Sequence, residues 1–517
     1  MSRSFLFAVA ASIAVVSLAP QAVRANIADA PPEASGAAVQ AETALLVRAA
    51  AAAKKNDLKT ALALSQAVVA APAFAGLDPE QQHVALMLVG ALRLQTGDAA
   101  GAIGFLKRSS AMDQADDTDW ELRTQAGVAL SDFDDAVQSL ATLARRWPAS
   151  LGDIDDADVF SVARQAGKLP DGDNRQFALR SALFEAHWKP TDPFNDASEI
   201  WRELARQLLA RGQAPRAAEV AAAVSGPGVV LSMRIDRDFD ALVQAAPERF
   251  DVDAARDRRI AELRAKVAAA PTSLDGVNIL ADMLVQSAHD EEALKLLDDA
   301  LARAQPPGGA KSVYADAADK LIWTMNLRAW ALKHLGRYDE AIAQMRKAAE
   351  RPEDGSVNVS QTINLGDELV EAGRPLEALK AVAGITPRSV SAYGLMAAEE
   401  VRGIAWFQLH DDAALAKSLA LAKAHADDAP DALLDITLLT GDQDAAAALI
   451  IGRLADPARR ADALVILQDW RLPPGATAFV RDQDRRLKAV RDRPDVQAAI
   501  AKVGHIERFE AYQQSGV

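Results

Sequence analysis

The 517-residue chain contains no cysteine, which excludes thiol nucleophiles and a lipid-modified N-terminal cysteine. Aromatic residues make up only 5% of the sequence. The sequence has no long stretch in which polar and apolar residues alternate, so it does not predict a sheet. Half of the residues nevertheless belong to the hydrophobic class, which alanine dominates. Because alanine is the best helix former, this composition predicts an all-α protein.

Local catalytic motifs are also missing. The seven histidines are scattered singly, and none lies in an H-E-x-x-H or H-x-E arrangement that would predict a zinc site. There is no G-x-S-x-G elbow, no Walker-type loop and no G-x-G-x-x-G. Residues 153–158 begin like a calcium loop but lack its glycine, and Arg164 stands where its glutamate should fall. We therefore expect no catalytic residue, cofactor or metal.

The charge balance is acidic, with a formal net charge of −15 and a sequence pI near 5.1. This argues against non-specific nucleic-acid binding, which needs clustered lysine and arginine. It is compatible with basic partners, although acidity alone mostly indicates solubility. Paired carboxylates such as Glu399/Glu400 and Asp427/Asp428 are interpreted as solvated helix and loop faces.

The N-terminus predicts a signal peptide over residues 1–25. Arg3 supplies a positive charge, and an apolar stretch from Phe5 to Ala19 follows that is short for a membrane span. Val23-Arg24-Ala25 then offers a cleavage site after Ala25. The alternative is an uncleaved anchor. After this segment no membrane-spanning run is expected, and residues 26–40 are expected to form a flexible linker.

A recurring pattern dominates the rest. Eight times, a small or turn-prone residue is followed five positions later by alanine within helical sequence. The pairs are Asn56/Ala61, Gly97/Ala102, Ser131/Ala136, Gly212/Ala217, Ala288/Ala293, Gly336/Ala341, Gly373/Ala378 and Gly441/Ala446.

The physical reason is clearest around Gly336. Met325, Ala329 and Leu332 precede it on one helical face, and Gly336 ends that helix because glycine adopts a left-handed conformation without penalty. Ala341 then begins the inner face of a second helix, where its small side chain lets two helix axes approach closely. The pattern therefore predicts a helical hairpin.

Eight such hairpins resemble the tetratricopeptide repeat, a helix–turn–helix unit of about 34 residues. The copy around Gly212 carries Trp201, Leu204 and Leu208 at positions that the family fills with large apolar residues. The resemblance implies an all-α, right-handed superhelical solenoid. Several copies depart from the family by carrying arginine where it prefers leucine, at Arg48, Arg123, Arg328 and Arg402.

The spacing of the pairs divides the chain. We expect N-terminal repeats over 41–225, an irregular helical segment over 226–270, C-terminal repeats over 271–470 and capping helices over 471–517. The long intervals after Ser131, Gly212 and Gly373 could each hold a degenerate repeat, of which residues 398–425, with a turn near His410, look most regular. Val229–Leu231 is either a short strand or the start of a helix. Residues 495–510 are expected to form a final capping helix.

The resemblance also implies a binding surface, because first helices line the concave groove in this family. The groove positions near Gly336 are Trp323, Asn326, Trp330 and Lys333, with Asn278 and Asn364 in the flanking repeats. Exposed tryptophan beside an amide and a cation is typical of interface hot spots. Asp282, Asp367 and Glu371 face the same groove, which argues against a clamp for acidic tails. Alternatively, the tryptophans pack between repeats.

Three functions remain open. The first is a non-enzymatic scaffold of a Gram-negative-type cell envelope, periplasmic or secreted, that binds protein or peptide in its groove. The second is an envelope hydrolase with a site in residues 150–260. The third is a structural spacer or self-assembling array.

Overall fold

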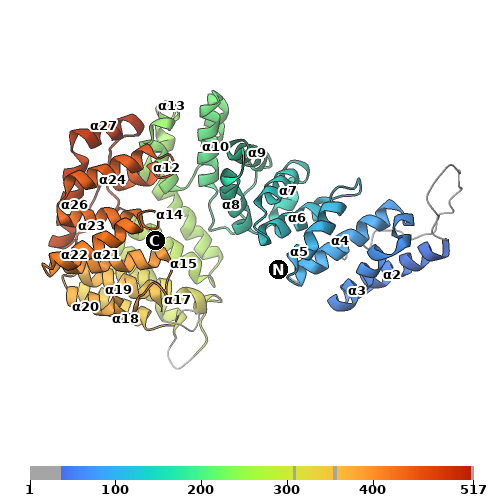
Figure 1. Cartoon of the computed structure of the whole chain (residues 1–517). Helices are drawn as coiled ribbons and strands as arrows, with labels where there is room; N and C mark the ends of the chain where they lie inside the picture. Colours follow the sequence, from blue (N-terminus) through green and yellow to red (C-terminus); the bar gives the residue numbers. More distant parts are fainter. Residues whose placement is uncertain (1–35, 307–309, 353–357, 514–517) are drawn as a thin grey trace. The chain divides into compact units, whose positions relative to one another are not determined.

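The computed structural model describes residues 36–306, 310–352 and 358–513, and the expected signal peptide lies outside these residues. The chain divides into two compact units, Met1–Gln207 and Leu208–Val517, and the division falls inside α10. Figure 1 shows that the described parts of both units consist mainly of helices. The helices of the first unit are α2 (Gly36–Lys54), α3 (Leu58–Ala70), α4 (Pro79–Gln95), α5 (Ala99–Ser109), α6 (Asp117–Ala129), α7 (Phe133–Arg146), α8 (Asp156–Gln165), α9 (Gly172–Glu185) and α10 (Ser198–Ala210).

The second unit continues the same architecture with two-residue strands near its end. Its elements are α11 (Ala214–Ala221), α12 (Pro227–Ile235), α13 (Asp240–Ala245), α14 (Val252–Ala269), α15 (Leu274–Gln286), α16 (Asp290–Ala304), α17 (Ala317–His334), α18 (Tyr338–Ala349), α19 (Val359–Glu371), α20 (Pro375–Ala381), α21 (Ala392–Gln408), α22 (Asp412–Ala424), α23 (Pro430–Thr440), α24 (Gln443–Ala455), α25 (Arg460–Ile466), β1 (Asp469–Trp470), α26 (Ala478–Arg491), α27 (Pro494–Val503) and β2 (Arg508–Phe509). Short 3₁₀ turns occupy Pro72–Gly76, Pro148–Asp153, Ala166–Lys168, Arg237–Phe239, Pro247–Phe250 and Val382–Gly384. The prediction of an all-α helical-repeat solenoid is confirmed.

Each of the eight predicted turn residues has a left-handed backbone, with φ between 56° and 85°. At Gly336 the N–H of Arg337 donates to Leu332 O at 2.9 Å, and the N–H of Gly336 donates to Lys333 O at 2.9 Å. This is the Schellman arrangement, which satisfies the last carbonyls of the first helix. The residue after the turn is already the N-cap of the second helix, so the two helices of this hairpin are joined by only three residues, Leu335, Gly336 and Arg337.

The eight alanines form the seams of the hairpins. Each lies four residues into its second helix, and each is 0% exposed. The residues are Ala61, Ala102, Ala136, Ala217, Ala293, Ala341, Ala378 and Ala446. A larger side chain at this place would push the two helices apart, because protein interiors are packed without spare volume.

The long intervals hold further helices, as expected. His410 has φ 57° and joins α21 to α22, which confirms the extra hairpin predicted over 398–425. After Ser131, the short helices α8 and α9 fill the interval, and an edge-to-face cluster of Phe160, Trp188, Trp201 and Phe184 packs beside them. Val229–Leu231 belongs to α12, so the helix alternative holds at that segment.

Two expectations are wrong at their boundaries. Helix α2 begins at Gly36, inside the segment expected to be a linker. The final helix α27 ends at Val503, well before residue 510. The reason is Gly504, whose extended backbone pairs with Asp236 in an isolated bridge. A Cβ there would lie 2.5 Å from Ile235 O, so a helical continuation with a side chain does not fit.

Three of the four unexpected arginines, Arg123, Arg328 and Arg402, reach from their first helices to polar partners. Arg123 donates to both carboxylate oxygens of Asp135 on the second helix of its own hairpin, at 2.9 and 2.6 Å. Arg402 donates to Val382 O and Ile385 O at 2.8 Å each. The arginines therefore replace an apolar contact by a charged hydrogen bond to a neighbouring segment, with the stem packed along the helix.

First helices form the inner wall of the second unit. Helix α15 contacts α17, α19 contacts α21, and α21 contacts α23, whereas the second helices α16, α18, α20 and α22 pack against the first helices on either side of them. A Cβ at Gly403 would lie only 3.0 Å from Ile436 Cγ1, which shows how closely α21 and α23 approach. Because first helices touch their successors, they line the concave side of the stack.

The end of the second unit returns to its beginning. The N–H of His505 donates to Ile235 O at 2.9 Å, and Arg234 Nε donates to Glu507 at 2.6 Å. Strands β1 and β2 pair in parallel within this returning segment. Residues 471–517 were expected to form capping helices, and within residues 471–513 the chain also contacts α12. Figure 1 allows the path from α12 to α27 to be followed by its green-to-red colours.

The seam predicts that a larger side chain destabilises the fold at a buried seam alanine but not at an exposed alanine of the same helix. Ala341→Leu should lower the free energy of unfolding by about 1–3 kcal/mol, because the added methyl groups overpack the hairpin. Ala343→Leu is the matched control, since Ala343 is exposed on the same helix. Urea denaturation followed by circular dichroism measures both. Equal midpoints for the two variants would contradict the role assigned to the seam.

Candidate functional site

The predicted asparagines lie between neighbouring inner helices. Asn278 on α15 is 6% exposed; its amide donates to Lys320 O at 3.1 Å and its oxygen accepts from the Thr324 hydroxyl at 2.8 Å. Asn326 on α17 is 1% exposed and accepts from Asn364 Nδ2 of α19 at 2.8 Å. Asn278 and Asn326 are thus buried links between hairpins rather than exposed groove residues, while Asn364 is partly exposed.

Lys333 lies at the C-terminal end of α17 and reaches across to α19. Its Nζ is 3.2 Å from Glu371 Oε1 and 3.7 Å from Glu368 Oε1. Burial disfavours the charged form of Lys333, but the two glutamates outweigh burial and raise its pKa. Glu368 is 1% exposed, and burial raises its pKa. The cation predicted for the groove is therefore already engaged by carboxylates of the next hairpin.

The two predicted tryptophans lie two turns apart on α17, and both are half-buried. Trp330 and Lys333 are three positions apart on this helix and therefore share one of its faces. The role of Trp323 and Trp330 in partner binding stays a prediction.

A row of three carboxyl groups crosses the inner wall beside this pair. Asp367, Glu400 and Asp435 lie on α19, α21 and α23, which are neighbouring first helices, and all three keep partial exposure. The Glu400 side chain hydrogen bonds to Asp435. Tyr393, 52% exposed, lies at the N-terminal end of α21 near the same row. We call Asp367, Glu400 and Asp435 the carboxyl row.

The row is electrostatically unfavourable when fully ionised. Burial, followed by Glu371 on the same helix, raises the pKa of Asp367 to about 7 although Lys333 opposes the shift. Burial and the neighbouring Asp435 and Asp367 raise the pKa of Glu400 well above its ordinary value. Burial also raises the pKa of Asp435, although Arg453 opposes the shift. Like charges that share a desolvated site hold protons because ionisation of each disfavours the next.

Sequence reasoning found only part of this site. Asp367 and Glu371 were expected in the groove, but Asp435 was not noticed. Glu399 and Glu400 were interpreted as a solvated face, and this is wrong: Glu399 is 8% exposed and paired with Arg402 at 2.9 Å, and Glu400 belongs to the carboxyl row. Asp427 and Asp428 are exposed, as expected. The available signal was that these acids fall on the inner face of first helices.

The region from residue 150 to 260, considered for a hydrolase, uses its best-connected carboxylate for structure. Asp156 accepts from the backbone N–H groups of Thr191 and Asp192 at 2.8 and 3.0 Å, and from Asn195 Nδ2 at 3.0 Å. Burial opposes the charged form of Asp156, but the backbone donors outweigh it and lower its pKa. Asp156 therefore anchors the loop between α9 and α10.

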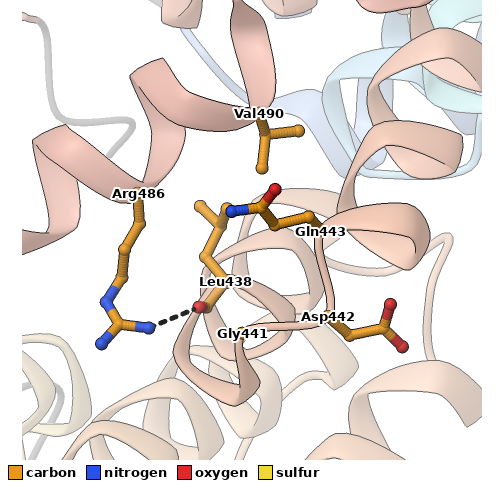
Figure 2. Close-up of a pocket in the computed structure, with 6 residues that line it drawn as sticks. All are labelled: Leu438, Gly441, Asp442, Gln443, Arg486 and Val490. Atoms are coloured by element: carbon orange, nitrogen blue, oxygen red, sulfur yellow. Dashed lines mark hydrogen bonds between the residues drawn. The ribbon is translucent and has the colours of Figure 1, made fainter. Parts of the chain in front are cut away.

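A small cavity lies where α26 covers the turn between α23 and α24. Its volume is about 50 Å³, which suits roughly one water molecule and no substrate. Figure 2 shows its six lining residues, with the Arg486 guanidinium directed at Leu438 O. That hydrogen bond is 3.1 Å long, and Arg486 also reaches Leu439 O at 3.4 Å. The cavity is thus part of a helix cap, in which Arg486 satisfies carbonyls at the end of α23.

Within residues 36–306, 310–352 and 358–513, no three histidine, aspartate or glutamate side chains are placed to hold a metal ion together. Over the same ranges, no helix combines the length and the apolar character that crossing a bilayer requires.

Comparison with known proteins yields structural likeness at low similarity. No family model matches the sequence, and no curated protein matches it. Solved structures that are similar include yeast Tom70, with 12% identity over 90% of this chain and 99% of that one and a TM-score of 0.34. Cut9 in the APC/C hetero-tetramer Cut9–Hcn1 has 14% identity over 89% and 96%, with a TM-score of 0.26. The TPR domain of P58(IPK) has 14% identity over 78% and 98%, with a TM-score of 0.20. Because these TM-scores are low, the fold assignment rests on the helices themselves and not on these likenesses.

The carboxyl row predicts a stability that falls as pH rises. Asp367 has an ordinary pKa of 3.8 and a folded pKa of about 7, so between these values the folded chain binds more protons than the unfolded chain. Unfolding then becomes easier with increasing pH across that window. Melting temperatures should therefore show Asp367→Asn close to the native chain at pH 4 and more stable than it at pH 8. Glu350→Gln, at an exposed helix end, is the control. Its melting temperature should differ from that of the native chain by the same amount at pH 4 and at pH 8. A variant less stable at pH 8 would contradict this assignment.

Proposed function

We propose that this chain is a non-enzymatic scaffold whose second unit binds a basic segment of a partner protein along its inner wall. The observation that carries the proposal is the carboxyl row, in which Asp367, Glu400 and Asp435 line one concave surface and keep partial exposure. A stack of hairpins offers an extended concave surface of this kind by construction.

The charges around the carboxyl row favour binding of a positively charged side chain from the partner. Lys333 is paired with Glu371 and Glu368 of α19, and Arg453, the cation that lowers the pKa of Asp435, is paired with Asp431 at 2.7 Å. A lysine or arginine from a partner would relieve the repulsion that holds protons on the row. Tyr393 lies beside the row, and aromatic faces attract such cations.

Binding of a lysine- and arginine-rich peptide tests the proposal. Its affinity for the native chain should exceed that of a charge-reversed peptide, and it should rise between pH 5.5 and pH 8 as the row loses its protons. The triple change Asp367→Asn, Glu400→Gln and Asp435→Asn should weaken binding roughly tenfold or more, because the charge pairs are lost from a desolvated surface. Fluorescence anisotropy measures both.

Glu350→Gln again serves as control, because it removes one negative charge from outside the inner wall. If Glu350→Gln lowered the affinity as much as the triple change does, the loss would be explained by net charge alone. Unchanged affinity in the triple variant would remove the carboxyl row from the binding surface, and binding of neither peptide would count against the scaffold proposal as stated.

The proposal includes location in a Gram-negative-type cell envelope, periplasmic or secreted, which the N-terminal sequence supports. Produced with its own N-terminus in such a host, the protein should appear in the periplasmic or external fraction. Its mature chain should begin at Asn26, because Val23 and Ala25 present small residues at the positions that signal peptidase reads. N-terminal sequencing of the purified protein measures this. A chain retained in the cytoplasm and beginning at Met1 would contradict it.

A further inference from the structure

A group of acidic side chains lies on the first helices of the first unit. Helix α2 contacts α4, and α4 contacts α6, so first helices form an inner wall here as they do in the second unit (Figure 1). Asp117 and Glu121 are four positions apart on α6 and share one of its faces. Asp153 ends the 3₁₀ turn Pro148–Asp153, which packs on α6. We call Asp117, Glu121 and Asp153 the α6 acidic cluster.

Glu121 occupies a repeat position that carries a buried link in other hairpins. It stands fifteen residues before the seam alanine of its hairpin, as Asn278 and Asn326 do in theirs. Both asparagines hydrogen bond to the next first helix, at Thr324 and Asn364. The charged groups that act on Glu121 are carboxylates, which accept but do not donate hydrogen bonds when they are ionised. Within the described part of the chain, Glu121 therefore lacks the link that the asparagines make.

The Glu121 side chain is deeply buried. It is 6% exposed, and among residues 36–306, 310–352 and 358–513 none donates a hydrogen bond to its carboxylate or pairs with it. Burial, followed by Asp153, Asp117 and Asp116, raises its pKa to about 8. Each of these neighbours disfavours the ionised form, and a buried polar group without a partner costs free energy. The site therefore favours a hydrogen-bond donor that carries a positive charge.

Two basic side chains beside the start of α6 already have carboxylate partners. Arg123, two positions after Glu121, donates to both carboxylate oxygens of Asp135. His83 of α4 has its Nε2 atom 2.7 Å from Asp119 Oδ2. These two side chains are therefore not available to neutralise Glu121.

The cluster reaches the protein surface through its other two members. Asp153 is exposed and Asp117 is partly exposed, and neither forms an ion pair within the described ranges. A long side chain can therefore pass these two groups and bring its end toward Glu121. In the part of the chain that the structure describes, no three acids are placed to hold a metal ion together. An ammonium or guanidinium group suits the cluster better, because its several N–H donors can reach carboxylates that are spread more widely.

We propose that the α6 acidic cluster binds a lysine or arginine side chain from a basic segment of a partner protein. The positive end of that side chain would lie between Glu121, Asp117 and Asp153 and would supply the link that an asparagine makes in other hairpins. The first unit would thus carry a docking point of its own, in addition to the carboxyl row of the second unit. The inference rests on the proposed function for the kind of partner, but it does not require the row to bind.

Chemical crosslinking in the full chain tests the proposal. The probe is a lysine-rich peptide with an amidated C-terminus, and a water-soluble carbodiimide joins a bound lysine to a carboxylate that it contacts. Mass spectrometry should find the peptide on Asp117, Glu121 or Asp153 about tenfold or more often than on Asp113. Asp113 is the control because it is exposed in the loop before α6.

Glu121→Gln removes the buried acid and keeps the size of the side chain. It should lower crosslinking at Asp117 and Asp153 about tenfold, whereas Asp113→Asn should leave it unchanged. Urea denaturation checks that the variants are folded. Asp153→Asn is a second variant at an exposed position, and it should lower crosslinking at Asp117 in the same way.

Each result decides the proposal. Crosslinks that are concentrated on the cluster and lost in Glu121→Gln support it. Equal crosslinking at Asp113, or a pattern that neither Glu121→Gln nor Asp153→Asn changes, would overturn it, because either result indicates attraction by net charge alone.

The same measurement separates this inference from the proposed function of the second unit. Crosslinks on the carboxyl row without any on the α6 acidic cluster would overturn only the docking point of the first unit. Crosslinks on the cluster that persist in the triple variant of the row, with none on the row in the native chain, would support the docking point and remove the row from the binding surface.

Discussion

Every hairpin depends on one backbone conformation, the left-handed residue that ends a first helix and aims the chain back along it. That residue satisfies the last carbonyls of the first helix and makes the next residue the N-cap of the second helix. The position of the second helix is then fixed, and so is the residue that meets the first helix most closely. In all eight copies this residue is a fully buried alanine. The fold is thus a repetition of one local constraint, in which each unit needs only its neighbours.

This construction leaves the inner face of the first helices free to carry polar groups, because the seams hold the stack without them. Buried asparagines link neighbouring hairpins, and Lys333 pairs with Glu371 of the next one. The members of the carboxyl row, by contrast, have pKa values raised by burial and by the neighbouring carboxylates. A fold with stability distributed over many seams can tolerate this local cost, and a surface that repels its own charges is suited to receive a cation.

The sequence predicted what is local. The turn at Gly336 and its alanine could be found because the signal lies within six neighbouring residues. The extra hairpin was found from Gly403 and the turn near His410, although Leu415 takes the place of the alanine there. Contacts between distant segments could not be found in this way. Nothing in the sequence around Gly475 indicates that it lies on Gly336, and Arg486 caps α23 from a segment that was expected only to cap the repeats. Glu400 was missed for a related reason, since a carboxylate on a solvated face and one on a concave wall have the same local sequence.

The most direct test of the central constraint is the free energy of unfolding of Ala288→Gly. Ala288 is a turn residue with φ 62°, where a Cβ costs about 1–2 kcal/mol that glycine avoids. Against this, glycine lowers the free energy of unfolding by about 0.4–1 kcal/mol, because it gives the unfolded chain more conformational entropy. We predict that urea denaturation will show Ala288→Gly to be at least as stable as the native chain, while Ala343→Gly on the exposed face of α18 loses about 1 kcal/mol. An equal loss in both variants would contradict the left-handed turn on which the hairpins depend.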